Sequence, residues 1–256
     1  MHRFYLPPDR CHGPTFSLSG REAHHARHVL RVVPGERVTV LNGAGAVLTC
    51  EVVGSRKNEL QLTVAEKNEM PPLPCAITLL QAIPRGKIIE SIIQKATELG
   101  VARIVPLLTE RVVTQIASDS ASAKAQKWEQ IAIEAIKQSG NPWLPRIEVP
   151  QSPEAFLDRR ENFALPIIAS LHDEPRPLRE HVEVFVRAHR ALPKTACVWI
   201  GPEGDFTRDE ADTIKAAGAL PITLGRLVLR VETAATVCLA LMNYELNGPP
   251  RSPATG

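Results

Sequence analysis

The pattern of apolar and polar positions changes once along the chain, near residue 71. Before this point, β-branched residues alternate with polar ones in short segments separated by turn-forming pairs such as Asn42-Gly43. The segment 22–31 has the spacing of one helix. The expected strands are 37–41, 46–53 and 60–65. We therefore predict a small β-barrel with one helix over residues 1–70.

A proline-rich linker, MPPLP at 70–74, separates this part from a different pattern. After it, apolar runs of strand length alternate with segments of helical periodicity. Thr207 and Glu210 have the spacing of a capping box that opens a helix ending near Gly218. The expected strands are 75–82, 101–107, 165–171, 196–200 and 220–224, and the other expected helices are 87–99, 124–138 and 232–246. This alternation predicts an α/β domain over 75–248 with a parallel sheet covered on both faces, followed by a frayed tail at 249–256.

Composition narrows the class of protein. The chain has 256 residues, 44% of them hydrophobic, and a net charge of +2, so any affinity for nucleic acid must come from local patches. Its five cysteines form no CxxC pair, which argues against a disulfide framework and a structural zinc site. The pattern contains neither a signal peptide nor a run of about 18 apolar residues, so we expect a cytoplasmic protein.

Two loops carry the candidate chemistry. IGPEGDF at 200–206 follows a buried strand and enters a capped helix, the place where open α/β sheets bind ligands. LGRLVLRVETAA at 224–235 also joins a strand to a helix. Its apolar residues are dense, so we expect this loop to be packed, with its backbone groups paired, for example by an adenine edge. The alternative is that 227–229 form one more strand.

The two loops in this order closely resemble the RsmE family, 16S ribosomal RNA uridine-N3 methyltransferases of the SPOUT class. GPEGDF is followed about twenty residues later by LGRLVLRVETA. Nearly the whole chain shares the resemblance. The other similar segments are RFYLP at 3–7, HHARHVLRVVPGERV at 24–38, KIIESIIQKATELGVARIVPLLTERVV at 87–113 and KWEQIAIEAIKQSGNPWLP at 127–145.

This resemblance implies a SPOUT domain with a C-terminal trefoil knot, preceded by a PUA-like RNA-binding domain. It also implies a homodimer, S-adenosylmethionine (SAM) as the cofactor, and a uridine of the small ribosomal subunit as the target. The chain departs from the family at Asp205, where a second glycine commonly follows GPEG. Aspartate can adopt turn conformations that suit glycine, and here it adds a carboxylate near the expected pocket.

The knot would form the cofactor pocket. Its walls would come from the two glycine-containing loops and the end of the strand at 165–171. The expected cofactor-binding residues are Ser170, Leu171, His172, Ile200, Gly201, Glu203, Gly204, Leu224, Gly225, Leu227, Val228 and Leu229.

Methylation at uridine N3 requires loss of the N3 proton and stabilisation of the developing negative charge. Arg230 is the first candidate for the stabilising cation, and a structural pair with Glu232 is the alternative. Glu203 could act as the base or face the sulfonium, or it could only fix its own loop. Arg111 is a second candidate for holding the nucleotide, although many arginines at strand ends are simply solvated.

Clustered cations in the N-terminal segment suggest contacts with RNA phosphates, against the alternative of a solvated basic helix face. The candidates are Arg3, Arg21, His25, Arg27, Arg31, Arg85 and Lys87. His24 and His28 have metal-ligand spacing, but no third ligand is evident nearby, so we expect no metal. Two alternatives to the expected enzyme remain. One is a non-catalytic RNA-binding or ribosome-assembly factor, and the other is a SPOUT methyltransferase acting on another RNA nucleotide.

Overall fold

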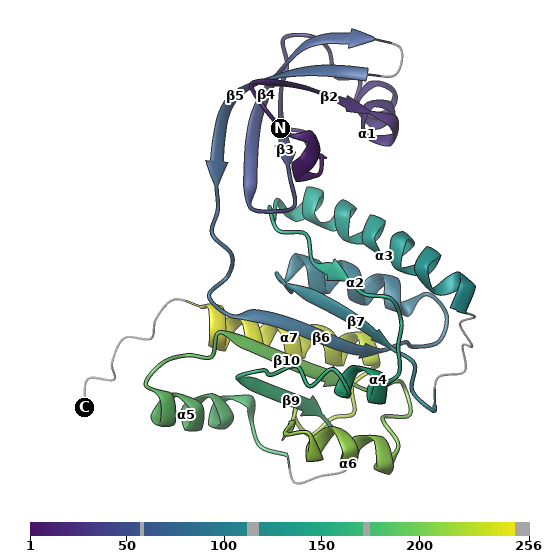
Figure 1. Ribbon diagram of the computed structural model, residues 1–256, viewed down its shortest axis with the longest axis vertical. Helices are drawn as coiled ribbons and strands as arrows, with labels where there is room; N and C mark the ends of the chain where they lie inside the picture. Colours follow the sequence, from purple (N-terminus) through teal and green to yellow (C-terminus); the bar gives the residue numbers. More distant parts are fainter. Residues whose placement is uncertain (57–58, 112–117, 171–174, 249–256) are drawn as a thin grey trace. The chain divides into compact units, whose positions relative to one another are not determined.

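A computed structural model describes residues 1–56, 59–111, 118–170 and 175–248 (Figure 1). Contacts divide the chain into two compact units. The first comprises Met1–Pro72 and Ala132–Leu144, and the second comprises Leu73–Ile131 and the chain from Pro145 onward. The division passes through the helix α3 (Ser118–Ser139).

The first unit is built on one curled sheet of five strands in the order β1-β3-β4-β5-β2. Only β1 pairs in parallel, and it does so with β3. Inward-facing residues such as Phe4, Val40 and Leu62 are fully buried and form the core of this unit. The strands are β1 (Arg3–Tyr5), β2 (Thr15–Ser19), β3 (Arg37–Leu41), β4 (Ala46–Arg56) and β5 (Glu59–Glu69). The three predicted strands are therefore confirmed, whereas β1 and β2 were not predicted. The strand β1 has only three residues, but β2 alternates polar and apolar residues over five positions, so its sequence pattern could have indicated it.

The predicted helix at 22–31 is confirmed in position, but it is not one regular α-helix. The helix α1 (Gly20–His24) continues as a π-helical turn over His25–Val29. The backbone N–H of Leu30 donates to the carbonyl of His25 at 3.0 Å, an i→i+5 bond. A single π-helical turn is too short to produce its own spacing of hydrophobic residues. The sequence pattern therefore could not distinguish it from α-helix.

Within the first unit, residues 132–144 make polar contacts with the segment Met1–Pro72. The Lys137 side chain is 6% exposed and its Nζ lies 2.9 Å from a carboxylate oxygen of Glu22, so this buried cation is paired. Arg3 donates to the carbonyls of Lys137 and Gln138 at the C-terminal end of α3, where a cation is favoured. The Trp143 indole N–H donates to the Met70 carbonyl at 3.1 Å.

The second unit contains a six-stranded, entirely parallel sheet in the order β11-β9-β10-β6-β7-β8. The strands are β6 (Ala76–Ala82), β7 (Arg103–Leu107), β8 (Arg146–Ile147), β9 (Leu165–Ala169), β10 (Thr195–Ile200) and β11 (Leu220–Ile222). The predicted α/β class with a parallel sheet is confirmed. The short strand β8 was not predicted, because two residues leave no pattern.

Helices cover both faces of this sheet (Figure 1). On one face α7 (Val231–Asn247) packs on β10 and contacts α2 (Ile88–Glu98) and α5 (Leu178–His189). On the other face α4 (Pro153–Leu157) and α6 (Arg208–Ala216) share a core with the sheet that includes Trp199 and Phe206. Both hydrogen bonds of the predicted capping box, between Thr207 and Glu210, are present at the start of α6.

The last helix packs on a different strand from the one that precedes it. The edge strand β11 pairs with β9, yet α7 packs on β10 and against α2. The connection from Ile222 to Val231 therefore crosses the carboxyl ends of β9 and β10. None of the described helices has the length and apolar character needed to cross a membrane.

Buried thiols should make the protein less stable in alkali. Burial raises the pKa of Cys197 and of Cys238 to about 12 from an ordinary value of 9.0. The unfolded chain ionises these thiols first, so their contribution is present below about pH 9 and is lost as the pH rises toward 12. We expect urea unfolding to show a lower free energy of unfolding at pH 10 than at pH 8. The variant Cys197→Ala/Cys238→Ala should show a smaller decrease, and an equal decrease would contradict this assignment.

Candidate active site

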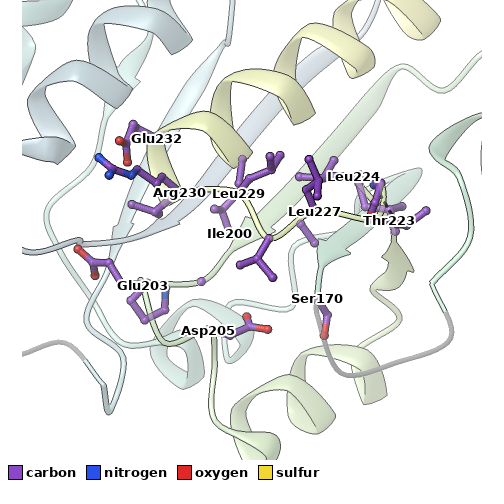
Figure 2. Close-up of a pocket in the computed structure, with 18 of the residues that line it drawn as sticks. Ser170, Ile200, Glu203, Asp205, Thr223, Leu224, Leu227, Leu229, Arg230 and Glu232 are labelled. Atoms are coloured by element: carbon purple, nitrogen blue, oxygen red, sulfur yellow. Dashed lines mark hydrogen bonds between the residues drawn. The ribbon is translucent and has the colours of Figure 1, made fainter.

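Three loops converge at the carboxyl ends of β9, β10 and β11 and enclose a cavity of about 790 Å³ (Figure 2). This is the edge of a parallel sheet where ligands bind. The cavity is lined by Ile88, Ala169, Ser170, Pro175, Ile200, Gly201, Pro202, Glu203, Asp205, Ile222, Thr223, Leu224, Gly225, Arg226, Leu227, Val228, Leu229, Arg230, Val231, Glu232 and Ala234.

The cavity has an apolar middle and a charged end. Figure 2 shows Ile200 and Leu227 among the aliphatic side chains at its centre, whereas Glu203, Arg230 and Glu232 gather at one end. Apolar walls with a few placed charges are typical of sites for small organic ligands.

The loop after β10 is tightly built around Asp205. This residue has φ 61°, in the left-handed region, which confirms that aspartate can replace glycine here. Its backbone N–H donates to the Pro202 carbonyl at 2.9 Å, and its Oδ1 accepts from the Phe206 N–H at 2.8 Å. A Cβ added to Gly201 would lie 2.7 Å from this Oδ1, so position 201 requires glycine for packing within the loop itself.

Side chains from other segments hold the same loop. The Arg111 guanidinium donates to the carbonyls of Gly204 and Phe206. Glu210 is buried, and its two carboxylate oxygens accept from the backbone N–H groups of Thr207 and Glu110, both at 2.9 Å. Hydrogen bonds of Glu110 and Arg111, which follow β7, thus connect this segment to the loop after β10 and the start of α6.

The loop at 223–230 corrects one expectation. It was predicted to be packed, but Leu227 is 79% exposed and Val228 is 77% exposed. No strand forms at 227–229 either. The segment crosses over the sheet edge rather than into a core, so its apolar side chains remain at the surface of the chain. In the part of the chain that the structure describes, the N–H groups of 227–229 donate to no protein group.

Most of the predicted cofactor-binding residues lie together in the cavity wall. Gly204 does not line the cavity; its carbonyl is held by Arg111. Leu171 and His172 lie outside the described residues. Sequence reasoning did not select Ile88, Pro175, Thr223 or Arg226 as cofactor-binding residues, although Ile88 and Arg226 lie in segments that carry the family resemblance. The residues found in the wall are Ser170, Ile200, Gly201, Glu203, Leu224, Gly225, Leu227, Val228 and Leu229.

The three candidate catalytic residues occupy different positions. Arg230 lines the cavity and, within the described residues, has no ion-pair partner, so the alternative pair with Glu232 is not observed. Glu203 also lines the cavity, and its Oε1 accepts from the Arg85 backbone N–H at 2.9 Å. Arg111 lies outside the cavity wall.

The predicted RNA-contacting residues are divided between the two units. In the first unit, Arg21 pairs with Glu134 at 3.6 Å, Arg27 donates to the Arg56 carbonyl, and Arg31 is exposed. Arg3 holds the end of α3, as described above, and the His25 ring lies edge-on to Phe4. Arg85 and Lys87 are exposed in the second unit.

The histidine pair of the N-terminal helix was considered as a metal site. The His24 and His28 rings lie 4.6 Å apart. Over the described residues, no group of three or more potential His, Cys, Asp or Glu ligands is found.

Comparison with protein families identifies the class of protein to which this chain belongs. An RNA methyltransferase domain matches residues 71–243, and an RNA methyltransferase PUA domain matches residues 18–65. A Synechocystis protein named ribosomal RNA small subunit methyltransferase E is 33% identical, over 94% of this chain and 77% of the relative. Its namesake in Bacillus subtilis is 31% identical over 91% of both chains. This chain therefore belongs to the ribosomal RNA small subunit methyltransferase E family.

Solved structures agree with this assignment. A methyltransferase from Legionella pneumophila, solved with its bound cofactor SAM, is 31% identical with a TM-score of 0.83, over 94% of this chain and 96% of that chain. Ribosomal RNA small subunit methyltransferase E from Neisseria gonorrhoeae, bound to SAM, is 29% identical with a TM-score of 0.83, over 95% and 97% of the two chains. The predicted SPOUT-class fold with an N-terminal PUA domain is confirmed.

The Arg111 contacts predict a stabilising role for this side chain. Arg111→Met removes the donors to the Gly204 and Phe206 carbonyls but keeps most of the aliphatic stem. We expect the free energy of unfolding to fall by about 1 kcal/mol. The charge-matched control is Arg208→Met, which removes an exposed cation from the first turn of α6 and should change stability little. Equal effects of the two variants would show that the contacts do not stabilise the loop.

Proposed function

We propose that this protein transfers a methyl group from SAM to N3 of a uridine in 16S ribosomal RNA of the small subunit. The observation that carries the proposal is the cavity between the loops at 201–207 and 223–230, in a chain of this family. Two relatives, from Synechocystis and Bacillus subtilis, are named ribosomal RNA small subunit methyltransferase E. Two similar solved structures contain bound SAM.

The residues of the cavity suit this cofactor. A volume of about 790 Å³ lies in the range of small-molecule sites, roughly 300–1,000 Å³. An adenine ring needs an apolar slot with backbone hydrogen bonds, and the loop at 227–229 offers aliphatic side chains beside N–H groups that, among the described residues, make no bond. The exposure of Leu227 and Val228 fits a surface that ligand or partner atoms cover.

When bound, SAM supplies an electrophilic methyl group on a sulfonium. Arg230 is placed to stabilise negative charge on uridine O2 or O4, since its guanidinium lines the cavity and remains charged. Glu203 is the candidate base, because one of its oxygens is held by the Arg85 N–H while the side chain remains exposed at the cavity's charged end. Arg111 acts by holding the loop in this proposal rather than by contacting the nucleotide.

The same proposal covers the finer features of the family. Residues 1–70 would form the RNA-binding domain, with phosphate contacts from the exposed cations, and 75–248 would form the catalytic domain. The crossing of 223–230 over the sheet would thread through the preceding loop to make the trefoil knot. We further propose a homodimer that works in the cytoplasm, where small subunits are assembled.

Labelled SAM and small subunits from a strain that lacks the enzyme test the proposal. We expect one modified uridine in 16S ribosomal RNA, located by mass mapping. Arg230→Met should lower the rate of methyl transfer by at least about tenfold while changing the Kd for SAM by less than about threefold, because the lost charge acts on the uridine. Unmodified RNA with a cofactor-binding protein would support a non-catalytic RNA-binding factor. Methylation of another nucleotide would support a different SPOUT specificity.

RNA binding should depend on exposed cations of the first unit. Arg31→Ala removes an exposed positive charge next to the π-helical turn. We expect weaker small-subunit binding and a salt slope of log Kd reduced by about 1, since one phosphate contact is lost. Arg187→Ala, an exposed cation of α5 that pairs with Glu183, is the control. If both variants keep the salt slope of the parent protein, Arg31 does not contact RNA.

A further inference from the structure

The cavity contains an acidic side chain whose position is set before any ligand binds. The conformation of Asp205 at φ 61° is one that L-residues adopt at an energetic cost, and hydrogen bonds to Pro202 and Phe206 help to hold it there. The Asp205 carboxylate packs closely against the loop, because a Cβ placed on Gly201 would lie only 2.7 Å from Asp205 Oδ1. Its rotation is therefore restricted.

Asp205 differs in burial from the other charged residues of the cavity wall. It is 8% exposed, whereas Glu203, Arg226 and Arg230 are exposed and Glu232 is half-buried. Figure 2 shows its carboxylate directed into the cavity, on the side where Ser170 lies. A charge removed from water acts more strongly on a nearby ligand charge than an exposed one does.

The reaction changes the charge of the ligand in this cavity. In the transfer, the bond between sulfur and the methyl carbon breaks, its electron pair stays on sulfur, and a bond forms between the methyl carbon and uridine N3. The N3 proton leaves to the base. The cationic sulfonium thus becomes the neutral thioether of S-adenosylhomocysteine, so a fixed negative charge distinguishes donor from product.

We propose that Asp205 is a specificity-determining residue that favours the cationic methyl donor over the neutral product. This inference rests on the proposed function, since it concerns the same cavity and the same cofactor. The carboxylate acts through its charge and not through the shape of the loop. Its effect is to promote product release relative to donor binding.

Calorimetry of the full chain with SAM and with S-adenosylhomocysteine tests the proposal. In Asp205→Asn, the side chain keeps an oxygen for the Phe206 N–H but loses its charge. We expect about tenfold weaker SAM binding and an unchanged Kd for S-adenosylhomocysteine. Asp205→Gly suits the positive φ, so it should fold and show the same loss of preference. Asp209→Asn, which removes an exposed acid from α6, should keep the preference of the parent protein.

An unchanged ratio of the two Kd values in both Asp205 variants would overturn the inference. Equal weakening of both ligands is one form of this outcome, in which the carboxylate acts as a hydrogen-bonding or structural group. If the parent protein binds neither ligand, the proposed function itself fails, and this result is distinguishable from an unchanged ratio. Melting temperatures of all variants identify any loss of folding.

Discussion

The site depends on one constraint of a parallel sheet, which is that the carboxyl ends of neighbouring strands meet at one edge. Because β11, β9 and β10 are neighbours in that order, the loops that follow them are brought together. The last of these loops must also carry the chain back to α7 on β10. This returning segment forms part of the cavity wall.

Hydrogen bonds to backbone carbonyls and N–H groups hold this edge. Arg111 and Glu210 connect the segment after β7 to the loop after β10, and Glu203 reaches the Arg85 N–H. Each of these loops leaves regular structure, so its polar backbone groups require such partners. The opposite case is the loop at 227–229, whose N–H groups donate to no protein group in the described part of the chain and whose Leu227 and Val228 side chains are exposed.

Much of the fold was predictable because its elements have clear periodicity. The strands β6, β7, β9 and β10, the capping box of α6 and the wall-forming loops were all indicated by local pattern and by family resemblance. The π-helical turn at 25–29 and the two-residue strand β8 were not, since neither leaves a hydrophobic period. The expected packing of the loop at 224–235 was wrong for Leu227 and Val228, because apolar composition does not show whether other parts of the chain cover a side chain.

The sequence alone determined the class of fold, the family and the two loops that bear the chemistry, because these depend on residue type and spacing. Only the tertiary structure decided what each side chain contacts. It placed Arg111 on the Gly204 carbonyl, left Arg230 at the cavity wall, and buried Asp205 beneath the cavity in a left-handed conformation. The physical reason is that the Arg111 contact joins residues about a hundred positions apart, and the burial of Asp205 and the exposure of Arg230 depend on packing that exists only once the sheet has assembled.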